Sequence, residues 1–244
     1  MTAAVQSKKY ALRGVIRHVY KQMGRALTDY TMLRDGDKVL VAVSGGRDSL
    51  SLLKLFQMKQ KRIPVQFELI VCFVETNFIK VDTAAVKAYL DSCGVRMVIR
   101  RIRLEKEADR TCFWCSWNRR KELFTAAREQ GCNLVALGHN LDDIAETVLM
   151  NLLFKGEIST SPPQLSMFDG EIRLIRPLCY LSKQEIEQFA AQFDFPDTHY
   201  ECPYGKDSKR VFVKRILREL EQECPFVKKN VFRALGRIKT EYLV

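Results

Sequence analysis

Short apolar runs alternate with stretches of helical periodicity along most of this 244-residue chain. The segments VLVAV (39–43), FELIVCFV (67–74) and NLVALG (133–138) are apolar at nearly every position. Strands of this kind are buried on both faces, because helices cover both sides of a parallel sheet. Each run is followed by a segment long enough for a crossover helix. The pattern therefore predicts a doubly wound α/β fold with a mostly parallel sheet.

The sequence predicts about five strands, with helices between and after them. Further strands are expected at 95–99 and 171–175. The polar segment 155–170 contains two prolines and two glycines, and we expect it to be a mobile loop over one edge of the sheet. Ser182 and Glu185 have the spacing of a capping box. Helices are expected at 15–30, from 49 onward, and at 81–93, 116–130, 142–154, 182–193, 207–223 and 225–239.

The length allows one large domain with a small appendage. We divide the chain into an N-terminal helical segment at 1–34, an α/β domain at 35–180, and a basic helical region at 181–244 that packs on the same domain. No apolar run approaches the ~20 residues of a membrane span, and the first residues lack a hydrophobic signal segment. A cytoplasmic protein is therefore expected.

Basic residues exceed acidic ones, with 40 Lys and Arg against 29 Asp and Glu. A net charge of +11 indicates a polyanionic partner such as a nucleic acid. The eight cysteines do not indicate a disulfide framework in a cytoplasmic chain, so a close pair of cysteines points to a metal or redox site instead.

The stretch SGGRDS (44–49) follows an apolar strand and leads directly into a helix. Ligands of open parallel sheets bind beyond the C-terminal ends of the strands. Glycines let backbone N–H groups approach a ligand, and a helix N-terminus adds partial positive charge. The loop is therefore predicted to hold phosphate, with hydroxyls from Ser44 and Ser49 and charge from Arg47. Asp48 indicates a divalent metal or a helix cap; the alternative for the whole loop is a tight turn capped by Asp48 or Ser49.

A second polar stretch, GHNLDD (138–143), also follows a strand and precedes a helix. Gly138 allows the backbone to approach a neighbour closely. His139 is either structural or catalytic. Asp142 and Asp143 are expected to cap the next helix or to hold Mg²⁺ through oxygen ligands.

Cys112 and Cys115 stand in TCFWCSWNRR, at the start of a predicted helix. The i, i+3 spacing puts both sulfurs on one face of that helix. A thioredoxin-like redox pair is one interpretation. Two cysteines do not complete a structural zinc site, which needs four ligands. Cys202, in ECPY, is a third candidate ligand.

These motifs together resemble known enzymes. SGGRDS is similar to the PP-loop of ATP pyrophosphatases, which split ATP between its α- and β-phosphates, and it lacks the spacing of a P-loop. With CFWCSWNRR, GHNLDD and ECPY in this order, nearly the whole chain resembles the TtcA/TtuA family of tRNA 2-thiolation enzymes. The family loop usually reads SGGKDS, whereas Arg47 replaces the lysine here. GHNLDD and ECPY look more like TtuA, while the N-terminal helix and the missing terminal zinc-finger cysteines look more like TtcA, so both branches stay open.

The resemblance implies an enzyme that uses ATP and Mg²⁺ to place AMP on the C2 oxygen of a tRNA pyrimidine and then inserts sulfur. It implies a [4Fe–4S] cluster held by Cys112, Cys115 and Cys202, with a fourth iron free to bind sulfur. Asp48 and Asp142 are assigned to catalysis together with these cysteines. The residues assigned to ATP binding are Ser44, Gly45, Gly46, Arg47, Asp48, Ser49, Gly138, His139 and Asp143.

The expected partners are tRNA, a sulfur donor and, as one option, a second copy of the chain, with no membrane. The donor is sulfide, a cysteine desulfurase or a sulfur-carrier protein. The target base has to leave its stack, which favours a loop nucleotide. Clustered cations would follow the RNA backbone, although a solvated helix face is the simpler interpretation. These residues are Arg119, Arg120, Lys121, Lys206, Lys209, Arg210, Lys214 and Arg215.

Two other functions compete with tRNA thiolation. The first is a PP-loop enzyme that adenylates a small molecule rather than tRNA, which the C-terminal basic residues disfavour. The second is a cluster-containing RNA-binding protein without ATP chemistry. The intact glycine loop at 44–49 makes it the weakest of the three hypotheses.

Overall fold

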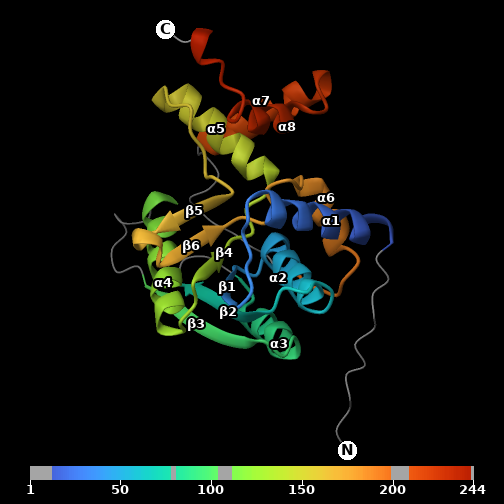
Figure 1. Cartoon of the computed structure of the whole chain (residues 1–244), viewed down its shortest axis with the longest axis vertical. Helices are drawn as coiled ribbons and strands as arrows, with labels where there is room; N and C mark the ends of the chain where they lie inside the picture. The colour runs from blue at the N-terminus through green and yellow to red at the C-terminus, as the bar shows by residue number, and fades with distance from the viewer. Residues whose placement is uncertain (1–12, 78–80, 104–111, 199–208, 243–244) are drawn as a thin grey trace, which may run out of the picture.

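The chain forms a six-stranded sheet with helices on both faces, in a computed structural model that describes residues 13–77, 81–103, 112–198 and 209–242 (Figure 1). Within these ranges the strand order is β3-β2-β1-β4-β6-β5, and β5 is antiparallel to β6 while the other pairs are parallel. A doubly wound, mostly parallel sheet is thereby confirmed. The strands are β1 (Asp37–Val43), β2 (Phe67–Thr76), β3 (Arg96–Ile102), β4 (Leu134–Ala136), β5 (Gln164–Met167) and β6 (Ile172–Ile175).

The segment 155–170 differs from the expected loop. It contains β5 and a short 3₁₀ turn at Phe168–Gly170, and β5 pairs with β6 as an antiparallel hairpin. The sheet therefore has one strand more than predicted. An edge strand with a solvated face needs no continuous apolar run. Leu165 and Ser166 are both exposed, so the sequence lacks the alternation that marks a half-buried strand.

Alternate residues of the central strands point to opposite faces of the sheet. In β1, Val39, Val41 and Val43 pack into one buried cluster, whereas Leu40 packs into another on the other face. The first cluster lies under α1, α2, α3 and α6, and the second lies under α4 (Figure 1). These helices are α1 (Gly14–Asp29), α2 (Arg47–Gln60), α3 (Thr83–Ser92), α4 (Cys112–Glu129) and α6 (Lys183–Ala190).

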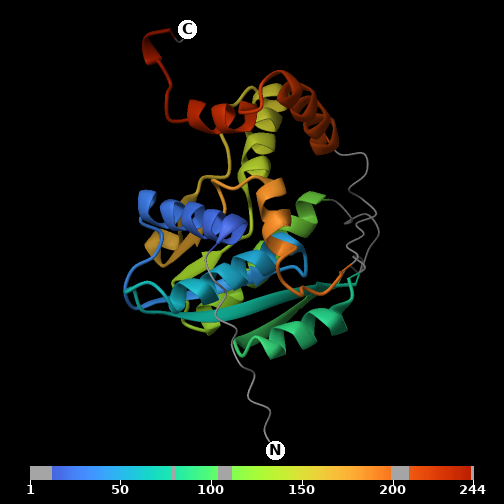
Figure 2. The same cartoon turned by 90° about the vertical axis from the view of Figure 1, so that its right-hand side faces the viewer.

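The last two helices pack on a helix that projects beyond the sheet. Helix α5 (Leu141–Lys155) rises from the end of β4, and α7 (Lys209–Glu223) and α8 (Val227–Ala234) lie against its upper part (Figure 2). A small buried cluster of Ala145, Val213 and Leu217 joins α5 to α7. A final 3₁₀ turn spans Thr240–Tyr242. Among the described residues, none of the helices combines the length and apolar character that crossing a bilayer requires.

The direction of strand order reverses between β1 and β4. From β1 the chain continues to β2 and β3 on one side, and it then returns to β4 and β6 on the other. Such a switch point leaves a crevice at the C-terminal ends of the two strands, where ligands of doubly wound sheets bind. The SGGRDS loop follows β1 and the GHNLDD stretch follows β4, so both motifs lie at this crevice.

Candidate active site

The glycine loop holds its own shape through Ser49. The Ser44 N–H donates to Ser49 Oγ at 3.1 Å, and this hydroxyl donates to the Gly46 carbonyl at 2.8 Å. Helix α2 begins at Arg47 with Gly46 as its N-cap, and no side chain caps it. Neither Asp48 nor Ser49 caps α2, so this part of the alternative is wrong, although Ser49 does hold the turn. The first N–H groups of α2, together with the helix dipole, stay available to an anion.

Glycines at the two strand ends let the backbones meet closely. Gly45 has φ +87°, and a Cβ there would lie 2.9 Å from Val86 Cγ2. A Cβ on Gly138 would lie 3.2 Å from backbone atoms of Asp48 and Ser49. The turn after β4 thus touches the first turn of α2 backbone to backbone. The close approach predicted for Gly138 is confirmed.

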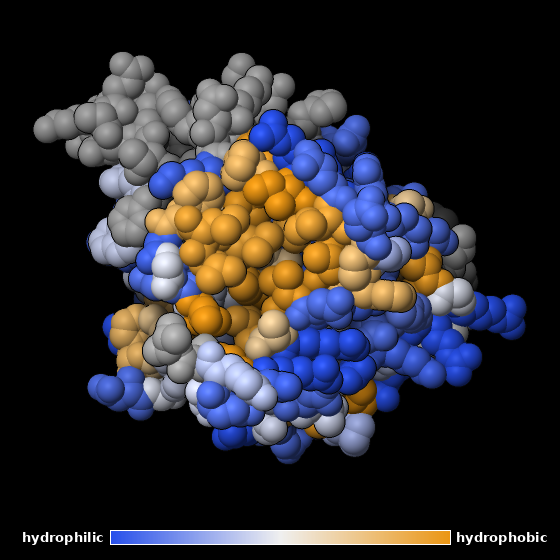
Figure 3. Space-filling model, turned by 90° about the horizontal axis from the view of Figure 1, so that it is seen from above, coloured by the Kyte–Doolittle hydropathy of each residue, from blue (hydrophilic) through white to orange (hydrophobic). Residues whose placement is uncertain are grey.

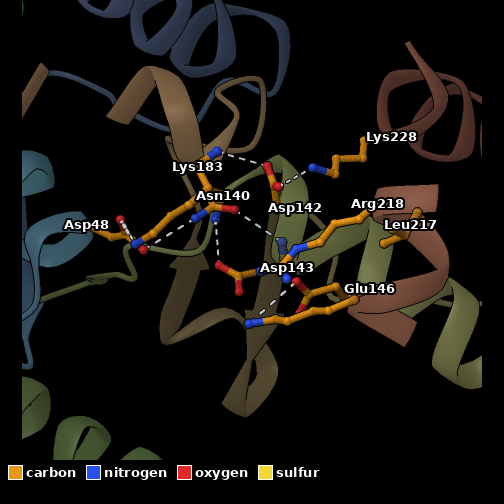
Figure 4. A pocket seen from close by; sticks show the side chains of 10 residues that line it. Asp48, Asn140, Asp142, Asp143, Glu146, Lys183, Leu217, Arg218 and Lys228 are labelled. Atoms are coloured by element: carbon orange, nitrogen blue, oxygen red, sulfur yellow. Dashed lines mark hydrogen bonds and ion pairs between the residues drawn. The ribbon is translucent and has the colours of Figure 1, made fainter. Parts of the chain in front are cut away.

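Asp48 points away from its own loop into a polar network (Figure 4). Lys183 Nζ donates to Asp48 Oδ1 at 2.7 Å, and Asn140 Nδ2 donates to Oδ2 at 3.3 Å. Burial raises the pKa of Asp48 above its ordinary value, and the hydrogen bond and charge of Lys183 oppose this rise. Lys183 lies outside the motifs and gave no signal in the sequence, whereas Asn140 lies within GHNLDD but was assigned no role.

The N-cap of α5 is Asn140, not Asp142 or Asp143 as the sequence suggested. The Asn140 side chain accepts from the Asp143 N–H, and the Asp143 carboxylate accepts from the Asn140 N–H, which completes a capping box. Asp142 accepts from Lys228 Nζ at 2.7 Å and from the Lys183 N–H at 2.9 Å. Both carboxylates therefore already bind protein groups. Asn140 in GHNLDD was the sequence signal for the N-cap of α5, since asparagine is among the best N-cap residues.

His139 is held neutral by its surroundings. Arg176 Nε donates to His139 Nδ1 at 3.2 Å, which leaves the ring proton on Nε2. Burial lowers the pKa of His139 to about 4; Asp143 opposes this effect, and Arg176 and Arg120 add to it. At neutral pH the ring therefore donates one hydrogen bond without carrying charge.

A cavity of about 210 Å³ opens between α2, α5, α6, α7 and α8 (Figure 4). Glu146 is 5% exposed, and its Oε2 has no hydrogen-bond partner. Burial raises the pKa of Glu146 to about 7, although Lys214 Nζ lies 3.7 Å and Arg210 Nε 3.8 Å from its carboxylate. Glu146 gave no signal in the sequence. The charged lining residues are Asp48, Asp142, Asp143, Glu146, Lys183, Lys214, Arg218 and Lys228.

The predicted cluster ligands are only partly described. Cys115 is half-buried on α4, while the side chain of Cys112 and the whole of Cys202 lie outside the described residues. Trp114 of α4 and Leu137, which follows β4, both pack against the buried cluster on the α4 face of the sheet. Thr198 Oγ1 donates to the Gly45 carbonyl at 2.7 Å, four residues before Cys202. Within the described part of the chain, no three His, Cys, Asp or Glu residues are grouped to bind a metal.

The predicted basic residues divide into two groups. On α4, Arg120 and Lys121 are exposed and Arg119 is half-buried. On α7, Arg210 and Lys214 face Glu146, whereas Lys209 and Arg215 lie over the rings of Phe154 and Phe212. Lys206 lies outside the described residues.

The switch-point crevice, the uncapped α2 and the glycine loop define the class of PP-loop nucleotide-binding domains. In agreement, the model of the PP-loop domain family matches residues 16–219. The tRNA-cytidine(32) 2-sulfurtransferase of Geobacter sulfurreducens is 35% identical, over 93% of this chain and 92% of that protein. That of Geobacter metallireducens is 34% identical, over 98% and 95% of the two chains. The chain belongs to this family of PP-loop tRNA sulfurtransferases.

A solved structure of similar fold supports the assignment. The U34-tRNA thiolase NcsA from Methanococcus maripaludis, determined with its [4Fe–4S] cluster, superposes with a TM-score of 0.73 and 26% identity. The similarity covers 96% of this chain and 82% of that one.

Proposed function

We propose that the chain replaces the C2 oxygen of cytidine 32 in tRNA by sulfur, in a reaction driven by ATP. The two Geobacter enzymes, which align with this chain over more than nine-tenths of their own length, carry this name. The uridine thiolase is more distant in sequence. The TtcA-like branch is therefore the better supported one. The uncapped N-terminus of α2 beside Gly45 is the observation that carries the ATP chemistry.

In this proposal the phosphates of ATP lie on the loop at 44–49. The N–H groups of α2 and the exposed Arg47 bind them. The C2 oxygen attacks the α-phosphorus, the bond to the β-phosphate oxygen breaks, and pyrophosphate leaves. Sulfur then bonds to C2, and AMP departs with the former carbonyl oxygen. Adenylation is needed because a carbonyl oxygen is a poor leaving group and an adenylate is a good one.

The polar groups of the crevice have defined parts in this reaction. His139 donates a hydrogen bond from Nε2 to an oxygen of the substrate, since its Nδ1 is occupied by Arg176. Lys183 holds the catalytic Asp48 in place. Asp48, Asp142 and Asp143 are not grouped to bind a metal, and each already binds an N–H or ammonium group of the protein, so Mg²⁺ would bind mainly through the phosphate oxygens of ATP.

Cys112, Cys115 and Cys202 would hold the cluster. Three thiolates suit an iron–sulfur cluster, and Thr198, four residues before Cys202, donates a hydrogen bond to the Gly45 carbonyl of the glycine loop. The cluster would supply an iron that binds the sulfur and delivers it to the activated base. This sulfur is sulfide, either free or released by a cysteine desulfurase or a sulfur-carrier protein.

Two sets of cations flank the crevice and would bind the tRNA backbone. Arg119, Arg120 and Lys121 belong to α4, and Lys209, Arg210, Lys214 and Arg215 belong to α7. A second copy of the chain is a further partner that we propose.

The test separates adenylation from sulfur insertion. Cluster-loaded protein is incubated without oxygen with tRNA, ATP and sulfide, and pyrophosphate and 2-thiocytidine are measured by enzymatic assay and nucleoside mass spectrometry. Wild-type protein should form both products, and only when tRNA is present. Cys115→Ala should still release pyrophosphate but form no 2-thiocytidine. Thiolated uridine in place of cytidine would contradict the substrate, and pyrophosphate release without tRNA would contradict the acceptor.

A further inference from the structure

Helix α1 carries a row of cations on the side that faces solvent. Its other side packs on the core through residues such as Val19 and Met23. The cations recur at every fourth residue, from the N-cap onward, and all are exposed: Arg13, Arg17, Lys21 and Arg25. Residues four apart lie on one face of a helix, about 6 Å apart along its axis. The row therefore forms a basic ridge along most of α1.

This ridge does not stabilise its own helix. Like charges at i, i+4 repel each other, and cations near a helix N-terminus oppose the helix dipole. Within the described part of the chain, Arg17 and Lys21 form no ion pair, while Arg25 pairs with Asp29 at 3.2 Å. Because the helix gains nothing from these charges, they indicate a negatively charged partner outside it.

Contacts with neighbouring elements show which way the ridge faces. His18 Nε2 lies 2.8 Å from Glu185 Oε1 of α6. The Arg25 guanidinium lies 5.2 Å from the centroid of the Tyr180 ring, just before α6. Lys21 is three residues after His18 and four before Arg25, so it lies between these two contacts on the same face. The ridge therefore lies on the side of α1 that borders α6.

Tyr180 joins this ridge to α8. The ring of Phe232 on α8 lies 5.9 Å from the Tyr180 ring, between centroids, and Figures 1 and 2 both show α8 above α1. Helix α8 has no acidic residue, and exposed cations recur at every fourth residue from Lys229. We call the cations of these two segments the basic band: Arg17, Lys21, Arg25, Lys229, Arg233 and Arg237.

The basic band begins beside the cavity of the active site. Lys228 of α8 lines this cavity and pairs with Asp142 at 2.7 Å. The next residue, Lys229, is exposed. Helix α6 likewise contributes Lys183 to the cavity and contacts α1 through Glu185. The band thus leads from the edge of the crevice along the outside of α8 and α1.

The upper side of the molecule is divided between two kinds of surface (Figure 3). Hydrophobic atoms gather at its centre, whereas its lower and right-hand parts are hydrophilic. Phosphates bind cations and not apolar atoms. A nucleic acid that reaches the crevice would therefore continue across the hydrophilic part.

We propose that the basic band binds the backbone of the paired tRNA stem that closes the loop of the target nucleotide. This inference rests on the proposed function, in which a loop base of tRNA enters the crevice. Because a loop nucleotide is joined to its stem, the stem phosphates lie beside the site that holds the loop. Phosphate contacts fix position and orientation without reading sequence. The band therefore positions the tRNA, and the crevice selects the base.

The test is a reversal of charge. Lys21→Glu converts two repulsive pairs, with Arg17 and Arg25, into attractive ones, so α1 should not lose stability. The tRNA Kd should rise about threefold or more at about 0.1 M salt, and the dependence of log Kd on log salt should fall by about one phosphate contact. Arg233→Glu should have the same effects from α8. Arg96→Glu is the matched control, since Arg96 is exposed at the start of β3, at the opposite edge of the sheet; neither quantity should change.

Two RNA probes separate the stem from the loop. One is a hairpin of the target loop with its stem, and the other is the loop sequence as an unpaired strand. Lys21→Glu in the cluster-loaded protein should bind the hairpin more weakly and the unpaired strand equally well. At saturating tRNA its kcat for pyrophosphate release should equal that of the wild type, while its KM for tRNA rises.

Two results would overturn the proposal. The first is a hairpin Kd of Lys21→Glu equal to that of Arg96→Glu, which would leave an acidic protein as the partner of the band. The second is equal weakening for the hairpin and the unpaired strand. A wild-type protein whose hairpin affinity depends on Lys21 but which forms no 2-thiocytidine would support the band and contradict the proposed function.

Discussion

Lys59 is a buried cation whose removal should stabilise the protein. It belongs to the last turn of α2 and is 5% exposed. Its Nζ lies 3.6 Å from the centroid of the Tyr20 ring of α1, and a Cβ on Gly24 would lie 2.6 Å from it. The ammonium group is thus enclosed between the two helices. Burial lowers the pKa of Lys59 from 10.5 to about 8.

The size of the effect follows from this pKa. A difference of about 2.5 pKa units, at about 1.4 kcal/mol each, means that burying the charge of Lys59 costs about 3–4 kcal/mol. The ring of Tyr20 returns about 0.5–2 kcal/mol of this through the cation–π contact. Lys59→Met keeps the length and apolar stem of the side chain. It should therefore raise the free energy of unfolding by about 1–3 kcal/mol at pH 7.

The pH dependence has a defined sign. Between pH 8 and 10.5 the unfolded chain keeps the Lys59 proton while the folded chain has lost it, so the wild type gains stability as the pH rises. Below pH 8 both states are protonated, and the full cost is present. The methionine variant lacks this dependence. Its advantage over the wild type should be largest at pH 7 and should shrink by pH 9.5.

The assay is urea unfolding followed by far-ultraviolet circular dichroism at pH 7 and pH 9.5, with both proteins prepared identically. Lys61→Met is the control, since Lys61 follows α2 and is exposed; it should change stability little. A Lys59→Met protein that is no more stable than the wild type at pH 7 would refute the reasoning. An advantage that stays constant with pH would refute it as well.

Three further substitutions test the crevice. Glu146→Gln should be more stable than the wild type by up to about 3 kcal/mol at pH 8, but not at pH 4.5. The reason is that the folded state keeps the Glu146 proton up to about pH 7, whereas the unfolded state loses it above about pH 4.5. Unfolding curves at both pH values measure this difference. Gly138→Ala should slow pyrophosphate release and lower stability by about 1–3 kcal/mol, because its Cβ would press on the first turn of α2. Gly236→Ala is the control: its Cβ would have no neighbouring atom closer than 3.9 Å, so neither quantity should change. Lys183→Met should lower the rate of pyrophosphate release by about tenfold or more, since Asp48 loses the ammonium group that orients it, and steady-state kinetics at varied ATP would show whether kcat or KM changes.

The sequence by itself determined most of the elements and the edge of the sheet at which the two motifs lie. Apolar runs specify buried strands, and the capping box of Ser182 and Glu185 is present as predicted. These signals are local, because a strand face repeats every two residues and a cap joins residues three apart. Because the strands are parallel, the 44–49 and 138–143 motifs could be placed at the same edge of the sheet, whereas the direct pairing of β4 with β1 is seen only in the structure.

Only the tertiary structure decided which side chains meet there. Lys183 is 135 residues from Asp48, and Lys228 comes from α8 to pair with Asp142. The burial that shifts the pKa of Lys59 and Glu146 likewise depends on how α1 and α7 pack. No periodicity or spacing encodes such pairs, since their energy arises from desolvation and Coulomb attraction between segments that are remote in the chain.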